Sequence, residues 1–430
     1  MIEKNKKPSI RFKGFTDEWE ERKFAEVYSY LQNNTLSRAE LNYESGIAKN
    51  VHYGDVLIKF GECLDVKTSK LPMILNESVL AKLKASFLKE GDVVIADTAE
   101  DETVGKCCEM VELKDEIVLS GLHTIPCRPN WKFATGYLGY YMNSPSYHDQ
   151  LLPLMQGTKV TSVSKTALKD TDVAYPKKIE EQIKIAAFFK QLNNLITLHQ
   201  RKYDKLINVK KIMLEKMFQK NGDNIPEIRF KGFTDEWEQR KFGELADYKK
   251  GPFGSALTKD MFVPRSNESI KVYEQQNAIN KNWKLERYYI PKDYAIKLNS
   301  FAVHGGDIIV SCAGTIGEIY ALPKGAESGV INQALMRIRV DENIIDKELF
   351  IYLFSNMINL FSKIHSNGSA MKNIPPFSDL KPTVVYVPSM AEQKKIVRLL
   401  NKMETLITLH QQELDKYKNI KKACFQRMFL

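Results

Sequence analysis

The stretch PSIRFKGFTDEWEERKF, from Pro8 to Phe24, returns as PEIRFKGFTDEWEQRKF from Pro226 to Phe242 with only two positions changed. A second repeated segment follows each copy: EQIKI, LITLHQ and MF mark Glu181–Phe218, and EQKKI, LITLHQ and MF mark Glu392–Phe429. The residues between these repeats have diverged almost completely. Solenoid repeats run about 20 to 50 residues, so the unit repeated here is a whole domain. The sequence therefore predicts a tandem duplication in which a common framework carries two dissimilar inserts.

A chain of 430 residues has room for two or three domains. We expect a first domain over residues 1–179, a connecting helix over 180–220, a second domain over 221–388 and a second connecting helix over 389–430. The predicted fold class is α+β. It consists of two mixed α/β domains, related by the duplication and separated by two long antiparallel coiled-coil helices.

Each second repeat predicts a long helix, because apolar residues recur in alternating steps of four and three. If the duplicated halves are related by a twofold axis, the helices run in opposite directions, and His199, Tyr203, His410 and Leu414 meet near the middle of the seam. We interpret the two histidines as polar register markers. The predicted seam residues are Ile185, Phe189, Leu192, Ile196, His199, Tyr203 and Leu206 in the first helix, and Ile396, Leu400, Met403, Ile407, His410, Leu414 and Tyr417 in the second.

Both inserts combine short apolar runs bounded by glycine with helical patterns. The runs GDVVIA and GDIIVS have the composition of buried strands, one in each half. Longer helical patterns follow each run. Predicted strands lie at 91–96 and 306–311, and predicted helices at 134–156 and 346–366.

The net charge of +10 and the pI near 9.0 favour a polyanionic partner, although a protein with no such partner can carry the same charge. Residues 177–220 hold eleven basic and four acidic residues, and residues 391–430 nine and four. Such a pattern suits a phosphate-facing helix or simply a solvated one. Six cysteines without zinc-type spacing, no signal peptide and no run of about 20 apolar residues predict a cytoplasmic protein that does not bind membranes.

Several polar, glycine-rich loops suit contact with double-stranded DNA. Glycine allows close approach of the backbone, lysine and hydroxyl groups bind phosphates, and amide side chains can pair with adenine. Each residue taken alone also fits an ordinary turn or strand end. The predicted DNA-binding residues are Lys249, Lys250, Ser255, Gln275, Gln276, Thr315, Asn332, Asn367, Ser369 and Lys372 in the second half, and Lys159 and Thr161 in the first.

Catalytic motifs are missing from the sequence. No G-x-x-x-x-G-K-[ST] loop occurs, and no glycine-rich cofactor loop accompanies an adenine-gripping motif. The only dense acidic run, at 97–102, fits a solvated loop better than a magnesium site. We predict a chain without catalytic residues, metal or cofactor.

The duplicated IRFKGFTDEWE opening, the E-Q-x-K-I entry to a long helix, and LITLHQ with its closing MF resemble the specificity subunit of a type I restriction-modification system. The resemblance covers the whole chain. GPFGSAL, SCAGTIGEIY and GVINQAL of the second half are similar to recurrent features of target-recognition domains, and the first half matches them less well.

This resemblance implies a non-catalytic DNA-binding subunit whose two domains each recognise one half of a split, asymmetric site. Its implied partners are two modification subunits, which methylate adenine with S-adenosylmethionine, and two restriction subunits, which translocate and cleave DNA with ATP and magnesium. Two other classes stay open. A fused methyltransferase or nuclease would need the missing motifs, and a protein-interaction scaffold with two variable domains would select no DNA sequence.

Overall fold

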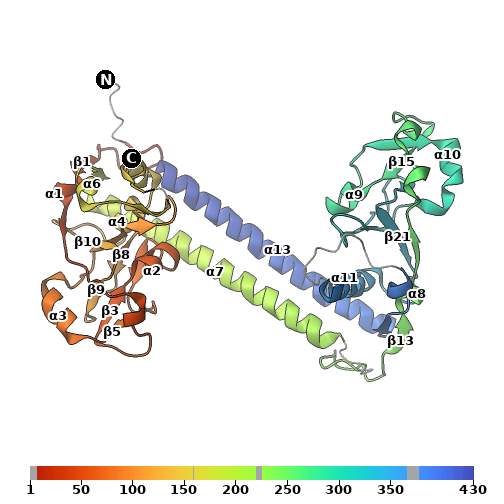
Figure 1. Ribbon diagram of the computed structural model, residues 1–430, viewed down its shortest axis with the longest axis horizontal. Helices are drawn as coiled ribbons and strands as arrows, with labels where there is room; N and C mark the ends of the chain where they lie inside the picture. Colours follow the sequence, from red (N-terminus) through yellow and green to blue (C-terminus); the bar gives the residue numbers. More distant parts are fainter. Residues whose placement is uncertain (1–6, 158, 219–224, 366–376) are drawn as a thin grey trace. The chain divides into compact units, whose positions relative to one another are not determined.

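The computed structural model describes residues 7–157, 159–218, 225–365 and 377–430 (Figure 1). The chain divides into two compact units. Unit 1 comprises Met1–Tyr203 and Leu409–Leu430, and unit 2 comprises Asp204–Thr408. Unit 1 is therefore closed by a segment from the far end of the sequence.

Unit 1 contains two mixed sheets. The five-stranded sheet has the order β2-β10-β6-β8-β4, and the three-stranded sheet has the order β5-β3-β9, with β3 and β9 parallel. Apolar residues alternate or run continuously in the central strands, which are buried on both faces. The strands are β2 (Tyr28–Tyr30), β3 (Ala48–Val51), β4 (Cys63–Asp65), β5 (Met73–Ile74), β6 (Val93–Ala96), β8 (Cys107–Val111), β9 (Val118–Ser120) and β10 (Thr124–Pro129).

Unit 2 repeats this arrangement although its sequence has diverged. One sheet has the order β14-β21-β18-β19, and the other the order β16-β15-β20-β17, with β15 and β20 parallel as β3 and β9 are. The inserts therefore share a core topology, to which unit 1 adds β4 and unit 2 adds β17. The strands are β14 (Ala246–Lys250), β15 (Ser269–Tyr273), β16 (Tyr288–Pro291), β17 (Ala302–Val303), β18 (Ile308–Ser311), β19 (Ile319–Ala321), β20 (Gly329–Ile331) and β21 (Leu335–Val340).

Two-stranded ladders tie the repeated framework to the inserts. In unit 1, β1 (Glu20–Lys23) pairs antiparallel with β12 (Asp172–Tyr175). In unit 2, β13 (Glu238–Lys241) pairs in the same way with β22 (Val384–Val387). Each ladder joins the first repeated segment to the strand that leads into a long helix.

A buried ion pair fixes the start of each long helix to the first repeat. The guanidinium of Arg11 donates to both carboxylate oxygens of Glu181, at 2.6 and 2.8 Å, and Arg229 donates to Glu392 at 2.8 and 2.9 Å. The bidentate geometry suits Arg and a carboxylate. The repeated IRF and EQ letters are thus explained by one contact, made once in each unit.

The long helices are α7 (Ile179–Met217) and α13 (Met390–Arg427), which pack against each other. Acidic residues lie in the first turn and a basic residue in the last turn of each, as the helix dipole favours. In unit 1, Phe189 of α7 stacks on Phe425 of α13 at 4.6 Å, and His199 meets His410. In unit 2, Lys210 pairs with Glu404. Residues further along α7 contact residues earlier in α13. The helices are therefore antiparallel, as the sequence predicts.

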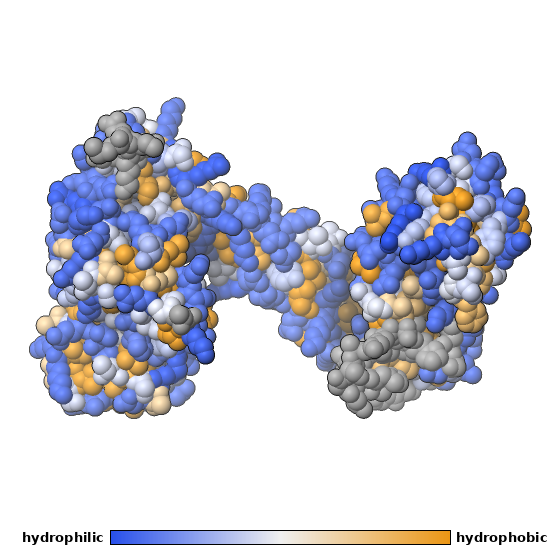
Figure 2. Space-filling model, turned by 45° about the horizontal axis from the view of Figure 1, so that its top comes forward, coloured by the Kyte–Doolittle hydropathy of each residue, from blue (hydrophilic) through white to orange (hydrophobic). Residues whose placement is uncertain are grey.

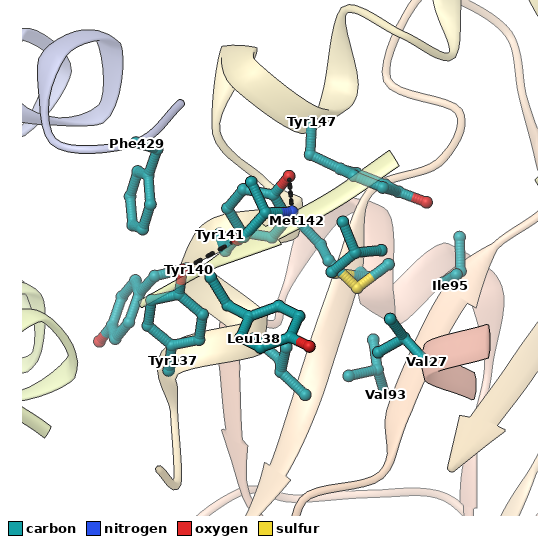
Figure 3. Close-up of a cluster of buried hydrophobic side chains, with 14 of the residues drawn as sticks. Val27, Val93, Ile95, Tyr137, Leu138, Tyr140, Tyr141, Met142, Tyr147 and Phe429 are labelled. Atoms are coloured by element: carbon teal, nitrogen blue, oxygen red, sulfur yellow. Dashed lines mark hydrogen bonds between the residues drawn. The ribbon is translucent and has the colours of Figure 1, made fainter. Parts of the chain in front are cut away.

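Aromatic side chains dominate the core of unit 1 (Figure 3). Tyr137 and Tyr141 are fully buried, and both bond to the backbone of Ala174 through their hydroxyl groups. Phe429, which follows α13, enters this core with its ring 6.5 Å from that of Trp19 and 5.8 Å from that of Tyr141. The repeated MF letters therefore mark a core anchor: in unit 2, Met217 is buried in the core and the ring of Phe218 lies 6.3 Å from that of Trp237.

The remaining short elements connect or cover the sheets. The predicted helix over 346–366 corresponds to α11, whereas the helix predicted over 134–156 is broken. Pro145 has no amide hydrogen and holds Ser144 in an extended conformation, so α4 ends before it and α5 starts at it. These elements are α1 (Phe24–Val27), α2 (Tyr53–Ile58), α3 (Glu77–Leu83), α4 (Tyr137–Met142), α5 (Pro145–His148), α6 (Lys165–Lys169), α8 (Phe242–Leu245), α9 (Gln275–Ile279), α10 (Lys292–Lys297), α11 (Lys347–His365), α12 (Phe377–Leu380), β7 (Thr98–Ala99) and β11 (Thr161–Ser162).

Candidate nucleic-acid interface

The parallel pair β15 and β20 brings two loops of unit 2 together. Tyr273 lies opposite Ile331 at the carboxyl ends of these strands. Asn332 follows β20 directly, and its amide donates to the carbonyl of Tyr273 at 3.0 Å. On the other strand, Glu274 caps α9, which places Gln275 in the first turn of that helix. Gln275 and Asn332 therefore leave the same edge of one sheet.

Two further loops join this edge. The amide of Gly251, just after β14, donates to the carbonyl of Leu335 at 2.8 Å. A side chain on Gly251 would place its Cβ 1.8 Å from the carbonyl oxygen of Asn332, so only glycine fits there. Thr315 lies in the loop after β18, and its carbonyl accepts a hydrogen bond from the side-chain amide of Gln275 at 3.4 Å. We call Lys250, Gln275, Thr315 and Asn332 the polar edge of unit 2.

The other residues predicted in this half have different surroundings. Lys249 and Lys250 belong to β14 rather than to a loop, and the ammonium of Lys249 lies 4.9 Å from the ring centre of Phe301. Gln276 is exposed and accepts a hydrogen bond from Asn280 within its own helix. Ser255 is exposed in a single 3-10 turn at Gly254–Ala256. Asn367, Ser369 and Lys372 lie outside the described residues.

Unit 1 has an equivalent edge with other side chains. Val51 lies opposite Ser120 at the carboxyl ends of the parallel strands β3 and β9. The Asn33 amide, after β2, donates to the carbonyl of Gly121 at 3.1 Å. Asn34 donates both to the side chain of Asn50, at 2.7 Å, and to the carbonyl of Ser120, at 2.8 Å. This network holds the ends of three strands together.

Aromatic and imidazole rings complete that edge. His52 follows β3 and packs beside Tyr53 with ring centres 4.7 Å apart, and Tyr53 meets His123 edge to face at 5.3 Å. His123 lies 3.4 Å from the carboxylate of Asp97. Burial lowers the pKa of His52, and the nearby Arg38 lowers it further. We call Asn33, His52, Tyr53 and His123 the polar edge of unit 1.

Sequence reasoning missed the polar edge of unit 1 and named Lys159 and Thr161 instead. Thr161 lies in β11, where its hydroxyl donates to the carbonyls of Ala99 and Asp101 at 3.1 and 2.9 Å. Lys159 is exposed. Because β11 pairs with β7, which directly follows Asp97, both residues lie next to the polar edge rather than in it. The sequence signal for the polar edge of unit 1 is the run of polar and aromatic residues at 50–53, where β3 ends.

The seam residues are buried to different degrees. Ile185, Phe189 and Leu192 join the core of unit 1, and Ile396 and Leu400 that of unit 2. Met403, Ile407 and Leu414 are buried, whereas Ile196, His199, Tyr203, Leu206, His410 and Tyr417 are half-buried.

His199 and His410 meet through their Nδ1 atoms at 3.1 Å, and Tyr417 packs beside His199. Burial lowers the pKa of His410, and His199 and Lys202 add to this effect. The outer surface of the long helices is mostly hydrophilic with apolar residues between (Figure 2).

Within the ranges that the structure describes, no three His, Cys, Asp or Glu side chains gather into a metal site. Likewise, none of the helices in those ranges combines the length and the apolar character of a membrane span. We therefore take the two polar edges as the candidate nucleic-acid interface, in which His52 is buried and His123 is exposed.

This chain is similar to specificity subunits of type I restriction enzymes. A Methanocaldococcus jannaschii protein assigned as the type I restriction enzyme MjaX specificity subunit is 20% identical over 419 residues, which are 94% of this chain and 91% of that protein. The MjaVIII specificity subunit of the same organism is 24% identical over 280 residues, or 62% of this chain and 63% of that protein. The crystal structure of a type I restriction-modification S subunit from M. genitalium covers 99% of both chains with a TM-score of 0.56. Its 11% identity shows a shared fold alone.

The family model described as "Type I restriction modification DNA specificity domain" matches residues 16–208 and again residues 234–419. The two matches contain the polar edges of both units and most of both long helices. Since they cover most of the chain, the protein belongs to the type I restriction modification DNA specificity family.

Proposed function

We propose that this specificity subunit recognises a bipartite, asymmetric DNA site, one half with the polar edge of each unit, and directs adenine methylation and restriction by partner subunits to that site. One observation carries the proposal. The same edge of the same topology presents different side chains in the two units, as two different half-sites would require.

The chemistry of unit 2 supports contact with both phosphates and bases. Gln275 and Asn332 carry amides, which can pair with the N6 and N7 atoms of adenine in the major groove. Gly251 lets the backbone approach closely, and the exposed Lys250 can neutralise a phosphate. In this arrangement Lys250 orients the DNA through its phosphates, and the neighbouring Gln275 and Asn332 select the sequence through base edges.

Unit 1 offers other groups at the equivalent place. Asn33 supplies one amide, while Tyr53 and the exposed imidazole of His123 supply ring edges and nitrogen atoms, and the buried His52 packs against Tyr53. Side chains of this kind select other base edges than a lysine and two amides do. The recognised half-sites should therefore differ, which makes the whole site asymmetric.

Two nearly identical framework segments can hold two copies of one partner. The resemblance to type I specificity subunits implies who these partners are, so we assign two modification subunits and, with them, two restriction subunits. S-adenosylmethionine, ATP and magnesium are assigned to these partners and no cofactor to this chain. The assembly would act in the cytoplasm on double-stranded DNA.

An exchange of inserts tests the assignment of the two units. In this proposal residues 1–179 and 221–388 recognise DNA, and residues 180–220 and 389–430 connect them. Replacing 243–386 with the insert of another specificity subunit should change one half of the target, as read from methylated adenines in cells that also make the modification subunit. If both halves change together, the units are not independent.

A glycine substitution tests the polar edge of unit 2 itself. Gly251→Ala would drive a methyl group into the backbone of Asn332, so the edge must rearrange and binding of one half-site should weaken. Gly254→Ala is the matched control, because its Cβ would meet no atom within 4 Å. Equal binding by both variants would remove the edge from the interface. Selection from a random DNA pool distinguishes this proposal from the scaffold hypothesis. A DNA-recognition subunit enriches particular sequences, whereas a protein-interaction scaffold enriches none.

A further inference from the structure

His199 and His410 occupy equivalent positions of the duplicated framework, and unit 1 brings them together. Both lie in the repeated letters LITLHQ, on α7 and α13 respectively. Their Nδ1 atoms are 3.1 Å apart, and their ring centres are 5.2 Å apart with the ring planes at 62°. The duplication has therefore placed two copies of one metal-binding side chain face to face.

A direct hydrogen bond between two Nδ1 atoms requires unlike rings. One imidazole must carry its proton on Nδ1 and donate it, while the other must accept with an unprotonated Nδ1. When both rings carry their proton on Nε2 instead, two lone pairs point into the same gap. Such a pair is an electron-rich site that a cation can occupy.

We infer that His199 and His410 bind one divalent transition-metal ion of the zinc, copper or nickel class between their Nδ1 atoms. A metal–imidazole bond is about 2.0 to 2.1 Å long. An ion at that distance from two nitrogens 3.1 Å apart sees them at an angle of roughly 100°. This angle lies between those of square-planar and tetrahedral coordination, and because the ion lies off the line joining the two nitrogens, both rings tilt toward it to bind.

The surroundings leave room for water to complete the coordination. Both histidines are half-buried, Leu414 is buried, and the Tyr417 ring lies 5.4 Å from the His199 ring. Among the described residues no third His, Cys, Asp or Glu joins the pair. Two imidazoles and water favour zinc, copper or nickel over magnesium or calcium, which prefer oxygen ligands.

Metal binding at this place would link two segments 211 residues apart in the sequence. Because an unfolded chain rarely holds two such ligands together, the ion binds the folded state preferentially and stabilises it. The inference does not depend on the DNA target, since the pair lies in the helix seam and not at a polar edge.

Zinc titration of the full chain tests the site. The chain is first stripped with a chelator and then titrated with Zn²⁺ by calorimetry, with Co²⁺ absorption as a second probe. We expect one equivalent to bind to the native chain and to raise its Tm. His199→Gln and His410→Gln should each weaken that equivalent by about tenfold or more, since even an outer-shell change costs 10- to 100-fold in affinity.

His304→Gln is the control, because His304 is exposed elsewhere and contacts Ser328. It should leave the titration unchanged. His410→Cys guards against a folding defect, since a thiolate restores a ligand and should give a sulfur-to-cobalt absorption band. The inference is overturned if the native chain takes up no ion, or if the double variant His199→Gln, His410→Gln binds as many equivalents with the same affinity.

Discussion

Lys249 and Lys250 are neighbours in β14, yet their side chains lie in different surroundings. Successive side chains of a strand point to opposite faces of the sheet. The Lys249 ammonium lies over the ring of Phe301, whereas Lys250 is exposed beside Gly251. The two lysines therefore face opposite sides of the sheet, which the sequence alone does not distinguish when both are predicted to contact phosphates.

This difference predicts unequal effects on DNA binding. Lys250→Ala should weaken binding of all sequences and reduce the slope of log affinity against log salt by about one, because one phosphate contact is lost. Lys249→Ala should leave the slope nearly unchanged. Affinities measured at several salt concentrations decide, and equal slopes for both variants would contradict the assignment.

Glu109 is a carboxyl group buried inside unit 1. Only 1% of it is exposed, and its two oxygens accept the amides of Gly136 and Gly139 at 2.6 and 2.8 Å. Burial raises its pKa from 4.5 to about 7, against the opposing effect of these hydrogen bonds. The folded state therefore holds a proton that the unfolded state has released between these two pH values.

The stability of unit 1 should accordingly fall as the pH rises. Below pH 4.5 both states are protonated, and above about pH 7 both are ionised, so the loss is confined to this window. The loss amounts to at most about 3.4 kcal/mol at 1.36 kcal/mol per pH unit. Urea unfolding of the native chain and of Glu109→Gln across this window tests the idea, since the variant should lack this part of the slope. Parallel pH profiles would refute it.

At the scale of elements, the Arg–Glu pairs decide how each long helix begins. Glu392 is 1% exposed and Arg229 is 11% exposed. Glu392 also accepts the indole N–H of Trp237 at 3.1 Å. The pair thus joins the first repeat to the first turn of α13.

Loss of one partner should be costly, because it leaves the other charge largely buried. Glu392→Gln should reduce the stability of unit 2 by about 3 to 5 kcal/mol. Glu20→Gln is the matched control, since its partner Arg22 is 45% exposed and such surface pairs contribute about 0 to 1 kcal/mol. Denaturation of both variants provides the comparison, and losses of equal size would show that the buried pair is not special.

Local patterns predicted the long helices well, and non-local pairing limited the rest. The seam of α7 and α13 is visible in the sequence because its period of apolar residues is local, and the predicted ends differ from the observed ones by only a few residues. The polar edge of unit 1 depends on Val51 lying opposite Ser120 in a parallel ladder. No local pattern reports such a pairing. Lys159 and Thr161 remain predicted DNA-binding residues, and the structure places Thr161 in the ladder of β11 with β7.

As a whole, the molecule is a specificity subunit of the type I restriction family and is itself non-catalytic. Its helix α7 is about 48 Å long from Ile185 to Met217 at 1.5 Å per residue, the length of roughly 14 base pairs. If the long helices set the spacing of the two half-sites, this length is an upper guide to their separation. The target is then defined by two short sequences and a fixed gap.

Insertion of four residues into both long helices tests that role. Each helix should lengthen by about 6 Å, so the unread gap should grow by roughly two base pairs while both half-sites stay the same. Mapping of methylated adenines in cells gives the new target. A gap of unchanged length would show that the helices do not determine the spacing.

The insertion of Phe429 into the core around Trp19 has a consequence for protein synthesis. Unit 2 is one continuous segment, whereas unit 1 needs residues from both ends of the sequence. A ribosome that adds about 5 to 20 residues per second makes Phe429 roughly 20 to 80 s after Trp19. Unit 2 should therefore close its core first, although it is translated second. Protease treatment of released chains that end before Phe425 should digest unit 1 faster than unit 2, so that the earliest-made domain is the last to mature.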